Sequence, residues 1–162
     1  MTLFNVRYVL VSDYGTVEHA GKLVIAGLYT EDMVVPALPA IFSSLVFTVI
    51  AETPAETTDY RFTVEAPSGG IVIGAEGRLA PLDNRQGTRP RAIIGFQFNG
   101  LVFEEPGDYS VVVASPDGSN RNVIHQYRIV VDPHLGGRDN SRQPFNDAAE
   151  TPDGKAKARR KA

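Results

Sequence analysis

Apolar and polar residues alternate with a period of two through most of the first 131 residues, and this pattern constrains the fold more than any other feature. Residues 58–66 show it most clearly. Tyr60, Phe62, Val64 and Ala66 fall on one side of an extended chain, whereas Asp59, Arg61, Thr63 and Glu65 fall on the other. No stretch sustains the apolar spacing of three and four residues that an amphipathic helix needs. The sequence therefore predicts strands with one wet face.

The same alternation predicts eight short strands. We expect them at residues 3–12, 22–29, 44–51, 58–66, 71–79, 91–99, 108–114 and 123–131.

The connections between these strands are of two kinds. Residues 66–70 and 115–120 combine Pro and Gly with small polar residues, as tight turns require, so each is expected to close a hairpin. Residues 31–39 and 81–91 are longer, and there the chain is expected to cross from one sheet to another. This mixture favours two packed sheets over a closed barrel.

The predicted fold is all-β: an immunoglobulin-like sandwich of about seven to eight antiparallel strands. The turn at Pro106 and Gly107 brings Tyr109 to the first inward position of a strand, where its hydroxyl is expected to bond back to the preceding loop. The chain has neither Cys nor Trp, so the disulfide and buried Trp of immunoglobulin domains are missing. The expectation concerns the architecture and not the antibody family.

The alternation stops after Asp132. Residues 1–132 are predicted to form the sandwich domain, and residues 133–162 a disordered tail in which Leu135 and Phe145 are the only large apolar residues. Charge divides in the same way. The predicted domain has 9 Lys and Arg against 15 Asp and Glu, a net of −6, and the tail has 7 against 4, a net of +3. An acidic body argues against nucleic acid as the partner of the domain.

Several short motifs occur along the predicted domain. They are Ser12-Asp13-Tyr14, Gly21-Lys22-Leu23, Gly27-Leu28-Tyr29, Pro36 with Pro39, and Pro106-Gly107-Asp108-Tyr109. Together they resemble a family of small, uncharacterised bacterial and phage-associated β-sandwich proteins, a domain of unknown function, over about residues 8–131. The resemblance implies the fold, and it implies no catalytic or binding residue.

Enzymatic or metal-binding signals are sparse. His19, His125 and His134 stand in different contexts, and no metal-binding spacing joins them. Acidic residues at strand ends and turns raise the alternative of calcium between loops, although no local run supplies six to eight oxygens. These residues are Asp13, Asp59, Asp108, Asp117 and Asp132. We expect no catalytic residue, metal ligand or cofactor.

Basic residues are the weak binding candidates. Lys22 is the only Lys in residues 1–132, and Arg85, Arg89 and Arg91 form a small basic loop on the acidic body. The end of the tail carries five cations that are able to contact an anionic partner weakly through counterion release. They are Lys155, Lys157, Arg159, Arg160 and Lys161.

Three functions remain open from the sequence. The first is a non-enzymatic binding or structural module, the second a metal-dependent or hydrolytic enzyme that uses the scattered His and Asp residues, and the third tethering by the tail. A histidine within hydrogen-bond reach of two carboxylates in a pocket would favour the enzyme. We expect a cytoplasmic protein without a membrane span, an unidentified protein partner, and nucleic acid only through the tail.

Overall fold

The computed structural model describes residues 3–19, 21–82 and 91–137 of the 162-residue chain. In these residues the chain forms nine strands, one 3-10 helix and no α-helix. The strands are β1 (Val6–Val17), β2 (Leu23–Leu28), β3 (Met33–Val35), β4 (Ala40–Glu52), β5 (Thr58–Glu65), β6 (Ile71–Leu79), β7 (Arg91–Phe103), β8 (Gly107–Ala114) and β9 (Asn122–Val131), and the 3-10 helix is η1 (Pro133–Gly137). No helix in these ranges is long and apolar enough to cross a membrane.

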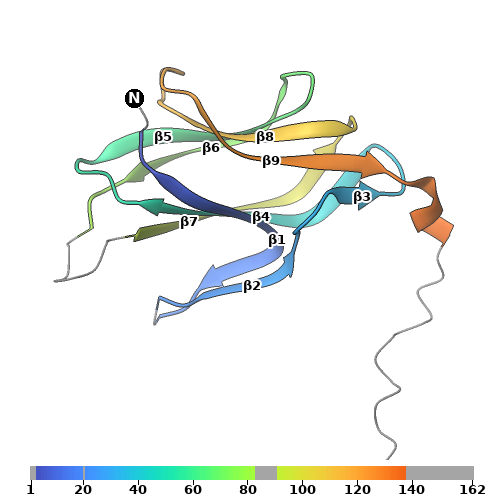
Figure 1. The fold of residues 1–162 in the computed structure, drawn as a ribbon, viewed down its shortest axis with the longest axis horizontal. Helices are drawn as coiled ribbons and strands as arrows, with labels where there is room; N and C mark the ends of the chain where they lie inside the picture. Colours follow the sequence, from blue (N-terminus) through green and yellow to red (C-terminus); the bar gives the residue numbers. More distant parts are fainter. Residues whose placement is uncertain (1–2, 20, 83–90, 138–162) are drawn as a thin grey trace, which may run out of the picture.

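The strands form two sheets that lie one above the other (Figure 1). Sheet A has four strands in the order β2-β1-β4-β7, and sheet B has five in the order β3-β9-β8-β5-β6. Neighbouring strands are antiparallel except β3, which pairs with β9 in parallel. The all-β class and the two sheets agree with the prediction from the sequence.

All eight predicted strands correspond to observed ones, but the described residues contain nine. The additional strand, β3, lies in the Pro-rich connection at residues 31–39 and is only three residues long. Its Met33 and Val35 are buried, and Val34 is exposed. Three residues are too few for a period of two to be recognised, so the sequence predicted only a crossover there.

The predicted connections are found where expected. Residues 66–70 join β5 to β6 and residues 115–120 join β8 to β9, and both strand pairs are antiparallel hairpins. The chain passes from sheet A to sheet B and back around β3, and again from β6 in sheet B to β7 in sheet A. Of this second connection, residues 83–90 lie outside the described part of the chain. The chain also crosses from β4 to β5 and from β7 to β8, which the sequence did not predict.

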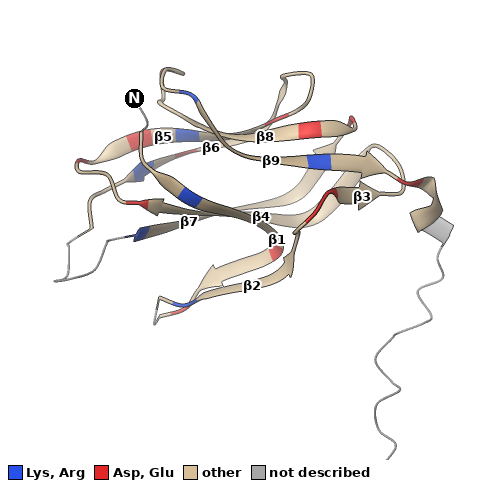
Figure 2. Cartoon of the chain, in the orientation of Figure 1, with Lys and Arg blue, Asp and Glu red and all other residues tan. Residues whose placement is uncertain are grey.

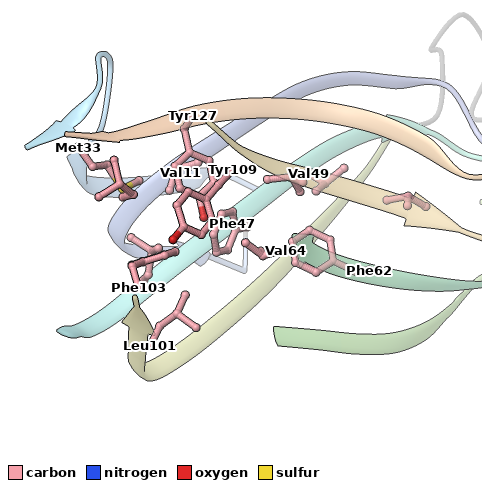
Figure 3. Packing of buried hydrophobic residues seen from close by; sticks show 14 of the residues in the cluster. Val11, Met33, Phe47, Val49, Phe62, Val64, Leu101, Phe103, Tyr109 and Tyr127 are labelled. Carbon is pink, nitrogen blue, oxygen red and sulfur yellow. The ribbon is translucent and has the colours of Figure 1, made fainter. Parts of the chain in front are cut away.

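The core lies between the facing sides of the two sheets (Figure 3). Aromatic rings connect the two sheets. The ring of Phe62 in β5 stacks on that of Phe96 in β7 with 4.0 Å between their centroids, and its centroid lies 5.7 Å from that of Phe47 in β4. Tyr60, Phe62 and Val64 of β5 are all buried, as the alternation predicts. Burial of such side chains is the main source of stability for this fold.

The outer side of β5 is less wet than the alternation predicts. Asp59 and Arg61 are exposed, but Thr63 is only 6% exposed and Glu65 is intermediate. Strand β5 lies between β6 and β8, where Val112 is the register partner of Thr63 and is itself buried. Neighbours on both sides therefore remove Thr63 from water.

Tyr109 forms the predicted corner. Its side chain is fully buried, and its hydroxyl donates a 2.7 Å hydrogen bond to the carbonyl oxygen of Glu105. Burial raises the pKa of this phenol. Beyond β9, the first five residues of the predicted tail form η1, and residues 138–162 lie outside the described part of the chain.

Candidate binding surface

The outer face of sheet B is covered by ion pairs between neighbouring strands. Figure 2 shows acidic and basic residues next to one another along β5, β6, β8 and β9. Arg61 pairs with Glu76 at 3.0 Å, and Arg128 pairs with Asp108 at 2.7 Å. The remaining pairs are Arg78 with Asp59 and Arg121 with Glu65. Charges satisfied in this way keep a face hydrated and soluble.

These pairs also act on the acidic side chains that form them. The guanidinium of Arg78 holds the pKa of Asp59 below its ordinary value, and Arg128 has the same effect on Asp108. Both carboxylates lie on exposed side chains, so each pair is a surface contact of small energy.

The outer face of sheet A has a different chemistry. Alternation places Val9 and Val11 in the core, and it therefore turns Tyr8 and Leu10 outward on β1. In the same way Ile50 of β4 and Ile93 of β7 point outward, and these two residues are register partners. Tyr8 lies opposite Ile50 and is 60% exposed. We call Tyr8, Leu10, Ile50 and Ile93 the apolar strip.

Few charges accompany the apolar strip. In the four strands of sheet A, the charged residues are Arg7, Asp13, Glu52 and Arg91. Arg7 is paired with Glu52, and Arg91 begins its strand. In Figure 2 the middle of β4 and of β7 and the whole of β2 carry no charge colour. An exposed apolar surface is typical of a face that meets another molecule.

The far half of β1 folds back over part of this face together with β2 (Figure 1). A Cβ atom on Gly15 would lie 3.2 Å from Val46 and 3.3 Å from Thr48, both of which point outward from β4. As a result Val46, Thr48 and Ser12 are buried although they belong to the outer face. The folded-back hairpin covers this end of sheet A and leaves the apolar strip beside it.

A polar corner fixes the bend in β1. The hydroxyl of Tyr29 donates to Oδ1 of Asp13 at 2.6 Å, and the hydroxyl of Ser44 donates to the carbonyl oxygen of Asp13. Gly27 has a φ of 66°, and a Cβ there would lie 2.2 Å from Oδ2 of Asp13. The position therefore requires glycine. Burial and the Asp13 carboxylate raise the pKa of Tyr29 to about 12.

Two grooves lie near the ends of the sheets. One has a volume of about 430 Å³ and is mainly apolar, with Tyr29, Val35, Pro39 and Ile41 among its lining residues. The other, of about 470 Å³, lies between the start of the edge strand β6 and the end of the edge strand β7. We call the second one the edge groove, and Asn99, Glu104 and Glu105 are its polar lining residues from the β7 side.

The predicted basic candidates do not form one described site. Lys22 is exposed next to the start of β2, and its carbonyl oxygen accepts a hydrogen bond from the amide of Glu18 across the hairpin. Arg91 is exposed at the start of β7. Arg85 and Arg89 lie outside the described residues. The same is true of all five tail cations, Lys155, Lys157, Arg159, Arg160 and Lys161.

The histidines and aspartates are dispersed. His125 is half-buried with its ring stacked 6.4 Å from that of Tyr127, and burial lowers its pKa. In residues 3–19, 21–82 and 91–137, no three His, Cys, Asp or Glu side chains are arranged to hold a metal ion.

Each aspartate that the calcium alternative would use has a contact of its own. Asp117 accepts hydrogen bonds from the amide and hydroxyl of Ser119, and Asp132 accepts one from the amide of His134. Asp13 is held by Tyr29, while Asp59 and Asp108 belong to ion pairs on the outer face of sheet B. The described aspartates therefore do not converge on one point.

The sequence interpretation did not identify the apolar strip, although a signal was present. Tyr8, Leu10, Ile50 and Ile93 occupy positions that the alternation assigns to the wet face, and all four are large and apolar. Apolar residues on both faces of β1, β4 and β7 distinguish sheet A from β5, which carries charges at the equivalent positions.

Comparison with protein families gives a match over most of the chain. The model of a family described as "Family of unknown function (DUF6941)" matches residues 7–131, which run from the second residue of β1 to the end of β9. The match therefore includes both sheets, the corner at Asp13 and the whole apolar strip. No curated protein matches the chain.

Proposed function

The chain belongs to the DUF6941 family of unknown function, and from this premise we propose that it is a non-enzymatic binding or structural module that recognises a protein partner through the apolar strip of sheet A. The observation that carries the proposal is the contrast between the two outer faces. Sheet B is covered by four ion pairs. On the apolar strip Tyr8 is exposed, Leu10, Ile50 and Ile93 are partly exposed, and no charge lies among them.

The chemistry of the strip specifies the partner. A surface with no charged group offers nothing to a nucleic acid or to a charged small molecule, but it matches an apolar protein surface. Tyr8 lies in the strip with more than half of its side chain exposed, and an exposed tyrosine is a typical anchor residue of protein interfaces. The partner surface is therefore expected to be apolar and uncharged where it meets Tyr8.

The proposal has finer parts that rest on the sequence. The two sheets are taken as an immunoglobulin-like sandwich, supported by the hydrogen bond of Tyr109 to Glu105. The resemblance of the motifs supports a bacterial or phage-associated origin. A cytoplasmic place of action is proposed separately. The basic end of the tail is proposed as a second, weak contact for an anionic surface.

Photocrosslinking in the native host tests the proposal. A photoreactive phenylalanine analogue at Tyr8 is expected to give a discrete adduct with another protein, because the strip is in contact with that partner. The matched control places the same analogue at Gln126, which is exposed on the outer face of sheet B. Equal labelling at both positions, or no adduct at Tyr8, would contradict the proposal.

A further inference from the structure

Strand β7 is an open edge of sheet A. It pairs with β4 on one side, and no described strand pairs with it on the other. The strand is 13 residues long, whereas β2, the opposite edge of the same sheet, has six residues. An edge of this length presents a row of backbone amide and carbonyl groups that a further strand is able to pair with.

Charged side chains and prolines, which commonly protect an edge strand, are missing from most of β7. Residues 92–103 contain no proline and no charged side chain. The neighbouring edge, β6, carries Glu76 and Arg78, both held in ion pairs with β5. Natural proteins place charges or prolines on edges in order to prevent uncontrolled pairing. Of these two edges, the longer one is therefore the one without protection.

Charge at the ends of β7 identifies the occupant. Arg91 begins the strand and has no ion-pair partner among the described residues, while Glu104 and Glu105 follow its last residue. Two copies of β7 that run antiparallel bring Arg91 of each copy next to the two glutamates of the other. Parallel pairing would instead bring Arg91 against Arg91, which is unfavourable.

We propose that β7 binds β7 of a second copy of this chain, antiparallel and around a twofold axis, so that the two copies of sheet A join into one eight-stranded sheet. The register centred on Gln97 sets Gln97 opposite itself and brings Arg91 of each copy to the end of the partner's β7. The proposal goes beyond the function proposed for the apolar strip and does not depend on it.

The side chains at the centre of β7 fit this register. Phe96 of one copy lies opposite Phe98 of the other, and both rings are only partly buried at the open side of the core. Aromatic pairs directly across two antiparallel strands stabilise the pairing. The twofold axis repeats the pair, so four phenylalanine rings cover the edge of the core. On the outer face, Gln97 is exposed and meets its own copy.

The edge groove provides the place for the arginine. Glu104 and Glu105 line it, and no Lys or Arg is among its lining residues. Glu105 already accepts hydrogen bonds from the amide and hydroxyl of Ser68, so its carboxylate is fixed in place. A guanidinium that arrives from the partner copy at the end of β7 would reach these carboxylates and gain charge-assisted hydrogen bonds.

Sedimentation equilibrium and a cysteine substitution test the pairing. The protein is expected to sediment with twice the 17.6 kDa mass of one chain. The chain has no cysteine, so Gln97→Cys introduces a single thiol at the axis. Residues directly opposite in an antiparallel pair have Cα atoms about 4.5–5.5 Å apart, which a disulfide spans. Gln97→Cys is therefore expected to form a disulfide-linked dimer on mild oxidation, whereas Gln126→Cys on sheet B is not.

Charge variants test the register. Gln97→Lys sets two cations against each other at the axis, and Arg91→Glu removes the pairing with Glu104, so each is expected to weaken dimerisation by about tenfold or more. Combining Arg91→Glu with Glu104→Lys is expected to restore the dimer. The melting curve of each variant in its monomeric form shows that the fold is intact. A protein that stays monomeric at all concentrations, or a dimer in which Gln126→Cys crosslinks instead of Gln97→Cys, would overturn the proposal.

Discussion

The rings of Tyr109 and Tyr127 stack on each other with centroids 5.8 Å apart and planes inclined by 13°. Only one of the two hydroxyls is satisfied. Tyr109 donates to the carbonyl oxygen of Glu105, whereas the buried hydroxyl of Tyr127 has no hydrogen-bond partner in the described part of the chain. Burial and the neighbouring Tyr109 raise the pKa of Tyr127. The hydroxyls of these two neighbouring tyrosines, on β8 and β9, thus contribute to stability with opposite sign.

Removing each hydroxyl separates these contributions. Tyr109→Phe is expected to lower the free energy of unfolding by about 1–2 kcal/mol, because it also leaves the carbonyl of Glu105 without its donor. Tyr127→Phe is expected to leave stability unchanged or raise it by up to about 1 kcal/mol, because it removes an unsatisfied polar atom. Urea titrations of both variants measure the difference. A larger loss for Tyr127→Phe would mean that its hydroxyl has a partner, such as an ordered water.

Phe62 is expected to be the most costly position to truncate on β5. It is fully buried and stacks on Phe96, so Phe62→Ala should lower the free energy of unfolding by about 3–5 kcal/mol through the cavity that it leaves. Thr63→Ala should cost about 1 kcal/mol, since Thr63 is buried on the other face but loses only a small polar side chain. Denaturant titrations with equal midpoints would contradict the assignment of the two faces.

The corner of β1 is accessible to titration at alkaline pH. Tyr29 has a folded-state pKa of about 12, above its ordinary value of 10.0, so its hydrogen bond stabilises the fold fully below pH 10 and is lost as the pH rises through 12. Asp13→Asn is expected to lower this pKa, because it removes the carboxylate and leaves only burial. Ultraviolet absorbance of tyrosinate measures the shift, and Tyr29→Phe identifies the transition. An unchanged titration in Asp13→Asn would show that burial alone sets the pKa.

His125 is expected to make the fold sensitive to mild acid. Burial lowers its pKa below the ordinary 6.5, so the unfolded chain takes up a proton before the folded one does. Stability is therefore complete above pH 6.5 and falls as the pH is lowered below that value. Thermal melts between pH 7 and pH 5 should show a flatter profile for His125→Phe than for the natural sequence. Identical slopes for the two proteins would assign the acid sensitivity to other groups.

The basic end of the chain is expected to bind nucleic acid weakly or not at all. Five cations in residues 155–161 gain affinity only through counterion release, and the net charge of −6 on residues 1–132 opposes it. A mobility-shift titration compares the full chain with residues 1–137 on duplex DNA and RNA. Retention that depends on residues 138–162 and disappears at physiological salt would fit this expectation. Equal retention of both proteins would place the contact in the domain.

The parts of the fold that the sequence predicted are those written in local patterns. The period of two predicted the strands. The turns with Pro and Gly predicted the hairpins at residues 66–70 and 115–120 and the corner at Tyr109. The parts that it missed depend on contacts between distant segments. Two examples are the bend that brings Gly15 close to Val46 and Thr48, and the hydrogen bond of Tyr29 to Asp13. Neither contact is recognisable from a local sequence pattern. The apolar strip was visible as residues but became a surface only when β1, β4 and β7 lay side by side.

Strand β3 has a consequence for how the protein is made. It pairs with β9, about a hundred residues further along the chain, and Met33 and Val35 enter the core beside that last strand. A growing polypeptide on the ribosome therefore has no partner for β3 until Val131 has been synthesised. Non-local pairing of this kind slows folding and leaves intermediates that expose apolar surface. Newly made chains are thus expected to expose apolar surface until β9 completes sheet B in the final step.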